Sequence, residues 1–160
     1  MNARLIEIDI DDTNLALPTP EIEQERKVAI FDLLEENFFA LPTGADAEQT
    51  AGPFRLQLGV RDRRLIFDVA DEANVRVAAV FVSLSPFRQV VKDYHQICEN
   101  YFDAVKRLPA SQIEVIDTAR RGIHDEGGRL LHERLEGKIE VDQPTARRLF
   151  TLICVLRFGG

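Results

Sequence analysis

The 160-residue sequence lacks the features that mark membrane, exported or disulfide-stabilised proteins. Its longest apolar runs, such as residues 77–82, are far shorter than the ~20 residues that a membrane-spanning helix needs. Residues 1–7 soon become acidic and lack the apolar segment and cleavage site of a secretory signal. Cysteine is scarce, and Cys98 and Cys154 both lie in apolar stretches of helical period. We therefore expect a cytoplasmic protein without membrane contact, whose thiols are reduced and buried.

The sequence also lacks the patterns that identify common catalytic and cofactor sites. The glycines of its C-terminal half match neither the Walker nor the dinucleotide-binding spacing. His95 and Cys98 offer two zinc ligands without a second pair, and a glycine pair separates His124 from His132. No nucleophile stands at a recognisable elbow. We expect no metal and no cofactor.

Positive charge is short in the first half of the chain. The formal net charge is −7, and residues 1–80 hold 8 basic and 16 acidic side chains, whereas residues 81–160 hold 12 and 11. Because acidic surface repels phosphate backbones, nucleic acid is not an expected partner of the first half. Association with RNA or the ribosome through the second half stays an alternative.

A strand and a helix are predicted at the start. In residues 5–10, isoleucines alternate with acidic residues, and Ile6, Ile8 and Ile10 share one side, which is the period of a half-buried strand. Thr19 followed by Pro20 is typical of a helix N-terminus. Apolar residues at helical spacing continue this helix, with a solvated acidic side, until before Pro42.

Three antiparallel strands should follow an exposed loop at 43–53. Alternating apolar residues at 54–60 and 65–69 predict a β-hairpin. Residues 75–84 form the third strand, and its middle, 77–82, is apolar at every position. Continuous apolarity indicates burial on both faces, so we expect this strand at the centre of the sheet.

The second half is predicted to be helical. Ser85-Pro86 begins a helix with a broad apolar stripe that ends near Pro109. Ser111 and Glu114 fit a capping box for the next helix, which the Gly127-Gly128 pair interrupts or ends. Asp142 caps a last helix to about Phe158, whose lack of a polar face indicates a helix surrounded by protein.

These elements predict one α+β domain over residues 1–160. Its N-terminal β-α-β-β-β segments form a mostly antiparallel sheet, and the C-terminal helical half packs on it. One domain of this size can barely surround both apolar segments, 77–82 and 149–156, so we expect a homodimer.

An internal echo supplies candidate anion-binding residues. Thr118-Ala119-Arg120-Arg121 recurs as Thr145-Ala146-Arg147-Arg148, near predicted helix beginnings. Paired guanidiniums there can hold a phosphate or carboxylate bidentately. The alternative is that these arginines pair with Asp117, Asp142 or nearby glutamates at helical spacing.

Two further clusters are candidates. Arg88, Lys92 and His95 project from one side of a helix and suit an anionic or acidic partner, unless they pair with the chain's own acidic helix. His124 and Glu126 precede a glycine turn and are candidates for a catalytic acid–base pair.

Four stretches together carry a resemblance to a known family. The stretches are residues 29–37, 84–94, 119–127 and 137–152. With them the sequence resembles number 0262 in the series of uncharacterised protein families, typical of alphaproteobacteria. This resemblance implies a bacterial cytosolic origin and identifies no catalytic residue.

The first functional interpretation is a noncatalytic binding or regulatory module that engages an acidic protein partner or an anionic small molecule through its basic residues. The alternative is a small enzyme for an anionic substrate, with His124 and Glu126 as acid and base and the arginines as clamp.

Overall fold

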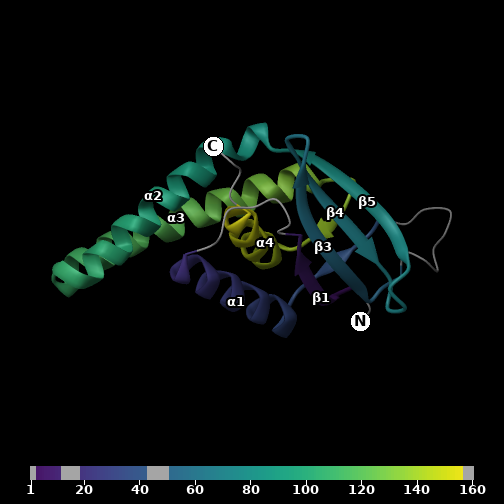
Figure 1. Ribbon diagram of the computed structural model, residues 1–160, viewed down its shortest axis with the longest axis horizontal. Coiled ribbons are helices and arrows are strands. Elements are labelled where there is room, and N and C mark those ends of the chain that lie inside the picture. The colour runs from purple at the N-terminus through teal and green to yellow at the C-terminus, as the bar shows by residue number, and fades with distance from the viewer. Residues whose placement is uncertain (1–2, 12–18, 43–50, 157–160) are drawn as a thin grey trace.

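The computed structural model describes residues 3–11, 19–42 and 51–156 (Figure 1). A β-sheet forms one end of this part of the molecule, and four helices extend from it. The elements are β1 (Leu5–Ile10), α1 (Pro20–Glu35), β2 (Phe39–Ala40), β3 (Phe54–Arg61), β4 (Arg64–Ala70), β5 (Arg76–Ser83), the 3-10 turn η1 (Ser85–Phe87), α2 (Arg88–Arg107), α3 (Ala110–Leu135), β6 (Glu140–Val141) and α4 (Gln143–Val155). The predicted α+β class is confirmed.

The main sheet has the strand order β1-β3-β4-β5. β1 runs parallel to β3, and the other neighbours are antiparallel. The predicted hairpin is β3–β4, and Asp62 and Arg63 form its two-residue turn with φ angles of 54° and 62°. Positive φ at both central residues is the requirement of the turn that matches strand twist.

β1 contains a register shift that the alternation of isoleucines did not predict. The irregularity lies between Leu5 and Glu7, so Leu5 is fully buried together with Ile8 and Ile10, whereas Ile6 is half-buried. An extra residue in one strand reverses the side to which the preceding side chains point. The predicted strand is confirmed, but the side of Ile6 was wrong.

The third of the predicted antiparallel strands, residues 75–84, does not lie at the centre of the sheet, so that prediction was wrong. This strand, β5, is at the edge, next to β4. Its inner side chain Val82 is buried, while Phe81 on the outer face is 42% exposed and is covered in part by the guanidinium of Arg64, 4.7 Å from its ring centre. The apolar outer face of β5 is therefore not a sign of burial within this chain.

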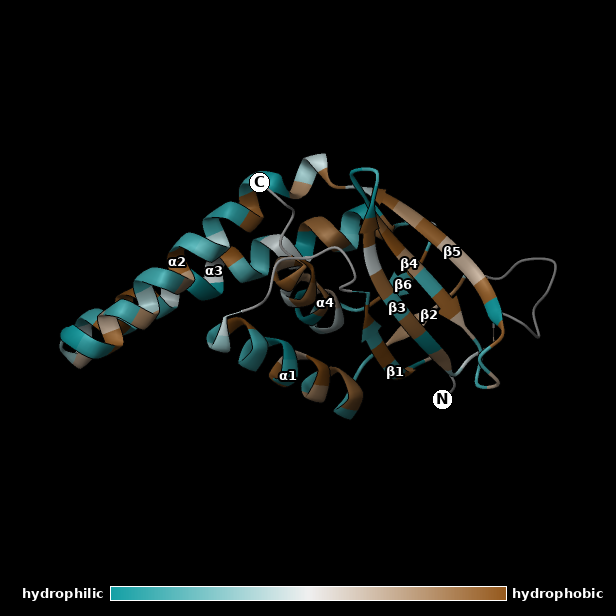
Figure 2. Ribbon diagram, in the orientation of Figure 1, coloured by the Kyte–Doolittle hydropathy of each residue, from teal (hydrophilic) through white to brown (hydrophobic). Residues whose placement is uncertain are grey.

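α4 is the central helix of the bundle. It lies between α1 and the α2–α3 pair, beside the sheet (Figure 1). Asp142 caps it as predicted, accepting from the backbone N–H of Thr145 at 2.9 Å. Nine of its residues are buried, and Figure 2 shows part of its ribbon in the brown of hydrophobic residues. Other segments of the same chain therefore surround this helix, which its lack of a polar face had indicated.

α3 is continuous through Gly127 and Gly128, so the predicted helix interruption was wrong. A Cβ at Gly127 would lie 2.3 Å from the ring of Phe150, and one at Gly128 would lie 2.6 Å from Cγ of Arg147. Both glycines let α4 cross α3 closely, and this packing offsets their low helix propensity.

The start of α3 also differs from the prediction. The helix begins at Ala110, directly after Pro109, and no side chain caps it. Ser111 therefore lies inside the first turn, two positions past the N-cap that a capping box requires, and the predicted box was wrong. The fixed φ of Pro109, −69°, sets the helix start instead.

Two short strands join the ends of helices and were not predicted. β2 pairs antiparallel with β6 over two residues, too few to produce a sequence period. Nearby, Asn37 accepts from the backbone N–H of Leu5 at 2.7 Å and donates to the carbonyls of Leu5 and Leu33 at 3.1 and 2.7 Å. These bonds anchor the end of α1 to β1.

Other predictions concern the ends of the described ranges. α1 begins at Pro20 with Thr19 as its cap, as predicted. Most of the predicted loop at 43–53, and the last residues of the predicted final helix, lie outside the described residues. Cys98 and Cys154 are free and buried, as predicted. None of the helices in the described ranges has the length and apolarity needed to cross a membrane.

Candidate functional site

A cavity of about 620 Å³ lies between α1 and the helices α2, α3 and α4; we call it the interhelical cavity. One side is a stripe of α1, and the other sides come from α2, α3 and α4. Its lining residues include both acids and bases together with apolar side chains. They are Pro20, Glu21, Gln24, Glu25, Val28, Ala29, Asp32, Tyr94, Phe102, Arg120, His124, Pro144, Arg147, Arg148 and Thr151.

The α1 wall follows from helical spacing. Glu21, Glu25 and Asp32 are four and seven residues apart, so they share one face of α1 with Val28. Below this face, Ala29 and Leu33 are buried in the core and hold α1 in place. The acidic face, predicted to be a solvated side of the helix, thus borders the cavity.

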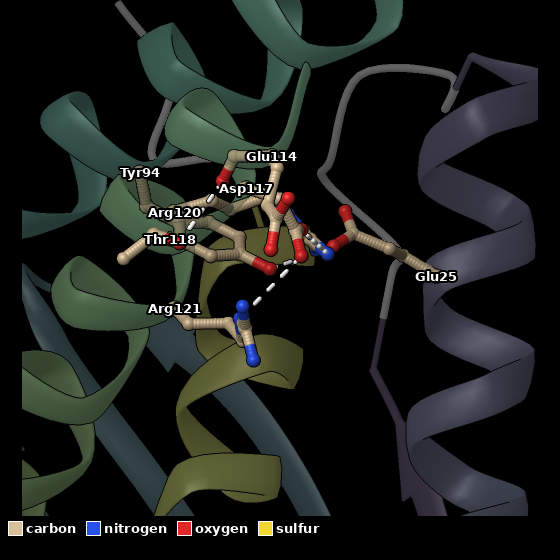
Figure 3. Close-up of polar contacts among 7 residues, drawn as sticks. All are labelled: Glu25, Tyr94, Glu114, Asp117, Thr118, Arg120 and Arg121. Atoms are coloured by element: carbon tan, nitrogen blue, oxygen red, sulfur yellow. Dashed lines mark hydrogen bonds and ion pairs between the residues drawn. The ribbon is translucent and has the colours of Figure 1, made fainter. Parts of the chain in front are cut away.

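Arg120 enters the cavity from α3 with an acidic partner on its own helix. Its Nη2 lies 2.7 Å from Oδ1 of Asp117, to which Nε also donates at 3.1 Å. Asp117 also pairs with Arg121, at 3.4 Å. The guanidinium of Arg120 lies over the ring of Tyr101, 4.8 Å from its centre. Figure 3 shows Asp117 between the two arginines. The alternative of arginines paired at helical spacing is confirmed for Asp117.

Arg147 and Arg148 enter from α4. Nε of Arg147 is buried and lies 3.0 Å from Oδ1 of Asp125, at an angle that does not make a hydrogen bond. Arg148 donates from Nη1 to the backbone carbonyl of Glu36 at 3.2 Å, and no carboxylate within the described ranges pairs with it. Of the cavity arginines, Arg148 therefore has the least committed guanidinium.

His124 connects α3 to α4. Its Nε2 lies 2.9 Å from the carbonyl oxygen of Arg147 and 2.5 Å from Oγ1 of Thr151. Because a carbonyl oxygen only accepts, Nε2 carries the proton and Nδ1 is the basic nitrogen. Burial, and next the positive charge of Arg147, lower the pKa of His124 below its usual 6.5. The imidazole is therefore neutral at pH 7.

Tyr94 joins α2 to α1. Its hydroxyl donates to Oε1 of Glu25 at 2.7 Å, and its ring lies 5.5 Å from that of His124 and 5.8 Å from that of Phe150. Figure 3 shows Glu25 reaching from α1 towards the α2 and α3 side chains that include Tyr94. Burial, and next the carboxylate of Glu25, raise the pKa of the Tyr94 hydroxyl far above its usual value. The Tyr94 hydroxyl thus stays protonated and acts as a hydrogen-bond donor at all physiological pH values.

The structure brings together only part of the predicted site. Arg120, Arg147, Arg148 and His124 line one cavity, although Arg120 and Arg147 come from different copies of the echo.

The other predicted residues lie outside this lining set. Arg121 and Glu126 are exposed on other faces of α3, and Arg88 and Lys92 are exposed on α2. His124 and Glu126 are two positions apart on a helix and so face different directions. Their role as an acid–base pair stays a prediction.

Sequence reasoning missed the α1 wall and Tyr94. Tyr94 belongs to the broad apolar stripe predicted for the helix that Ser85-Pro86 begins, and within such a stripe its hydroxyl carries no signal. Glu21, Glu25 and Asp32 do share a helix face in the sequence, but the arginines that they face are about a hundred positions away. Within the described ranges, no three His, Cys, Asp or Glu side chains gather in a way that suits a metal ion.

Comparison with known proteins identifies the family. The model of the uncharacterised protein family UPF0262 matches residues 2–159. The chain belongs to this family. It is 65% identical to a UPF0262 protein of Ruegeria sp. (strain TM1040) over 99% of both chains. It is 66% identical to one of Dinoroseobacter shibae, also over 99% of both chains. The predicted resemblance is confirmed. No solved structure matches the chain.

Proposed function

We propose that this protein is a noncatalytic module that binds a small anionic molecule in the interhelical cavity. The observation that carries the proposal is the convergence of Arg120, Arg147 and Arg148 on one concave site. The volume of about 620 Å³ is that of a metabolite site, since pockets for small molecules measure roughly 300–1,000 Å³.

The surroundings of the arginines support binding rather than internal pairing alone. Among the described residues, the guanidinium of Arg148 has one hydrogen bond, to a backbone carbonyl, and Asp125 lies beside Nε of Arg147. A guanidinium has five N–H donors, so these partners leave donors of both residues for a ligand. Two adjacent guanidiniums suit a carboxylate or phosphate.

Catalysis has less support than binding. His124 lines the cavity, but its Nε2 is engaged by Arg147 and Thr151, and Glu126 is exposed outside the lining set. A general acid and base must both reach the reacting groups of one substrate.

The test is calorimetric titration and thermal unfolding with a panel of mono-, di- and tricarboxylates and phosphate esters. At least one is expected to bind and to raise Tm, because a ligand that binds only the folded state stabilises it. Arg148→Gln should weaken that binding by at least tenfold, since one charge-assisted hydrogen bond contributes about 1.5–3 kcal/mol.

Arg121→Gln is the matched control. Arg121 occupies the same place in the echo as Arg148, but it is 61% exposed and lies outside the cavity. Its variant should bind like the parent protein. Equal weakening by both variants, or no binding of any compound in the panel, would count against the proposal.

A homodimer is a second proposal, and the open edge of β5 is the observation that favours it. Among the described residues, β5 pairs only with β4, and it presents eight residues without proline or lysine. Val75 is 59% exposed and Phe81 42%. Unprotected edges of this kind pair with a second chain, and two-fold antiparallel pairing of β5 would join two sheets.

A further inference from the structure

The two walls of the interhelical cavity carry opposite charges. The α1 wall contributes Glu21, Glu25 and Asp32. The facing wall contributes the arginines of α3 and α4, and His124 beside them is neutral. The lining also includes two apolar side chains, Val28 on α1 and Phe102 on α2, which are 47% and 37% exposed. The cavity is therefore acidic on one side and basic on the other, with apolar side chains in its lining.

Within the described part of the chain, no ion pair crosses this cavity. Arg120 pairs with Asp117, and Arg147 lies beside Asp125. Both aspartates belong to α3, on the basic side. Arg148 reaches α1 only at the backbone carbonyl of Glu36. Among the described residues, the α1 acids that line the cavity form no ion pair with these arginines. Glu25 instead accepts a hydrogen bond from the neutral Tyr94.

This separation indicates the class of ligand. An anion alone would satisfy the arginines but would bring negative charge towards Glu21, Glu25 and Asp32. A cation alone would have the opposite defect. A molecule with both charges can contact each wall with its complement, and complementary charges determine selectivity more than affinity.

We propose that the ligand is a zwitterion of the amino-acid class, with its carboxylate at Arg147 and Arg148 and its ammonium group at the acids of α1. This inference rests on the proposed anion-binding function and specifies its ligand. The side chain of the amino acid lies along Val28 and Phe102, which favours an apolar one.

The first step of the test is titration of the protein with each of the twenty proteinogenic amino acids. The best binder is then compared with its deamino acid, which lacks the ammonium group, and its decarboxylated amine. For leucine these are 4-methylpentanoate and 3-methylbutylamine. We expect at least one amino acid to bind, and to bind at least tenfold more tightly than either analogue.

Variants of the acidic wall separate a binding role from a structural one. Glu21→Gln with Asp32→Asn should weaken binding of the amino acid at least fivefold, yet leave unchanged or strengthen binding of the deamino acid. A loss of structure would weaken the binding of both compounds. Glu23→Gln is the control, since Glu23 lies on α1 but outside the lining set. Arg148→Gln should weaken the binding of both the amino acid and the deamino acid.

Two results would overturn the inference while the proposed function survives. One is equal affinity for the amino acid and its deamino acid; the other is binding of organic acids from the earlier panel with no binding of any amino acid. If neither amino acids nor organic anions bind, both the inference and the proposed function fail.

Discussion

The ring of Phe150 on α4 occupies the space where a side chain on residue 127 of α3 would be. A Cβ added at Gly127 would lie 2.3 Å from the ring, and Phe150 is fully buried. Neither helix can move away easily, because both pack in the core. This contact determines how closely the two helices that carry the cavity arginines cross.

We therefore expect Gly127→Ala to destabilise the protein by about 1–3 kcal/mol, the usual effect of overpacking a core. The measurement is urea unfolding followed by circular dichroism. Gly122→Ala, in the same helix, is the control, because a Cβ there meets nothing within 4 Å. It should stabilise by about 0.5–1 kcal/mol through helix propensity. Equal effects of the two substitutions would contradict the close crossing.

Tyr94→Phe should loosen α1. The substitution removes the hydroxyl that donates to Glu25 at 2.7 Å and leaves the ring contacts in place. We expect a loss of about 1–2 kcal/mol, because the acceptor is a carboxylate that is only half-buried. Hydrogen exchange of the α1 amides should be faster in the variant than in the parent protein, whereas exchange of the α4 amides should change less.

Tyr101→Phe is the control for that comparison. Its ring lies under the guanidinium of Arg120, a contact that phenylalanine keeps. Its effect on stability should be small, and exchange of the α1 amides should not change. Unchanged α1 exchange in Tyr94→Phe would show that the bond to Glu25 does not hold the helix.

Local signals predicted local structure well. Thr19 and Asp142 were found as helix caps because a cap and the amide that it binds lie within three residues of each other. The β3–β4 hairpin was found because its alternation and its turn are adjacent in the sequence. These features depend little on the rest of the fold.

The errors arise where distant segments decide the outcome. Gly127 and Gly128 have low helix propensity, and only the crossing of α4 explains why a helix continues through them. The apolar residues of β5 indicate a strand but not its place in the sheet.

The candidate site divides in the same way. The arginine echo was visible in the sequence, but the facing acids of α1 come from the other half of the chain. The sequence therefore indicated an anion site without its second wall, and Arg121 could not be told apart from Arg120.

The stability of the protein should depend on pH through His124. Burial and the charge of Arg147, with a smaller contribution from Arg120, lower the pKa of His124 in the folded state, whereas the nearby Asp125 raises it. The unfolded chain therefore binds the proton more readily. The stability that neutral His124 contributes is fully present above about pH 6.5, the usual pKa of histidine. It is lost as the pH falls towards the lower pKa of His124 in the folded protein.

Urea unfolding between pH 5 and pH 7 measures this effect. The parent protein should lose stability as the pH falls through this window, and His124→Gln should show a flatter dependence because glutamine does not titrate. His132→Gln, at an exposed position of the same helix, should keep the slope of the parent. Identical slopes for the parent and His124→Gln would contradict this account.

The proposed dimer predicts a change in mass when a charge is placed on the β5 edge. Ala79 is exposed at the middle of β5, so a two-fold antiparallel pairing brings the two copies of this residue close together. Ala79→Lys should place like charges opposite each other and shift the protein to monomer, measured by sedimentation equilibrium over a range of concentrations.

Gln57→Lys is the control, since Gln57 is exposed on β3, an inner strand of the same sheet. It should leave the dimer unchanged. A parent protein that is monomeric at every concentration would exclude the dimer, and dissociation by both lysine variants would place the interface on the sheet face rather than at its edge.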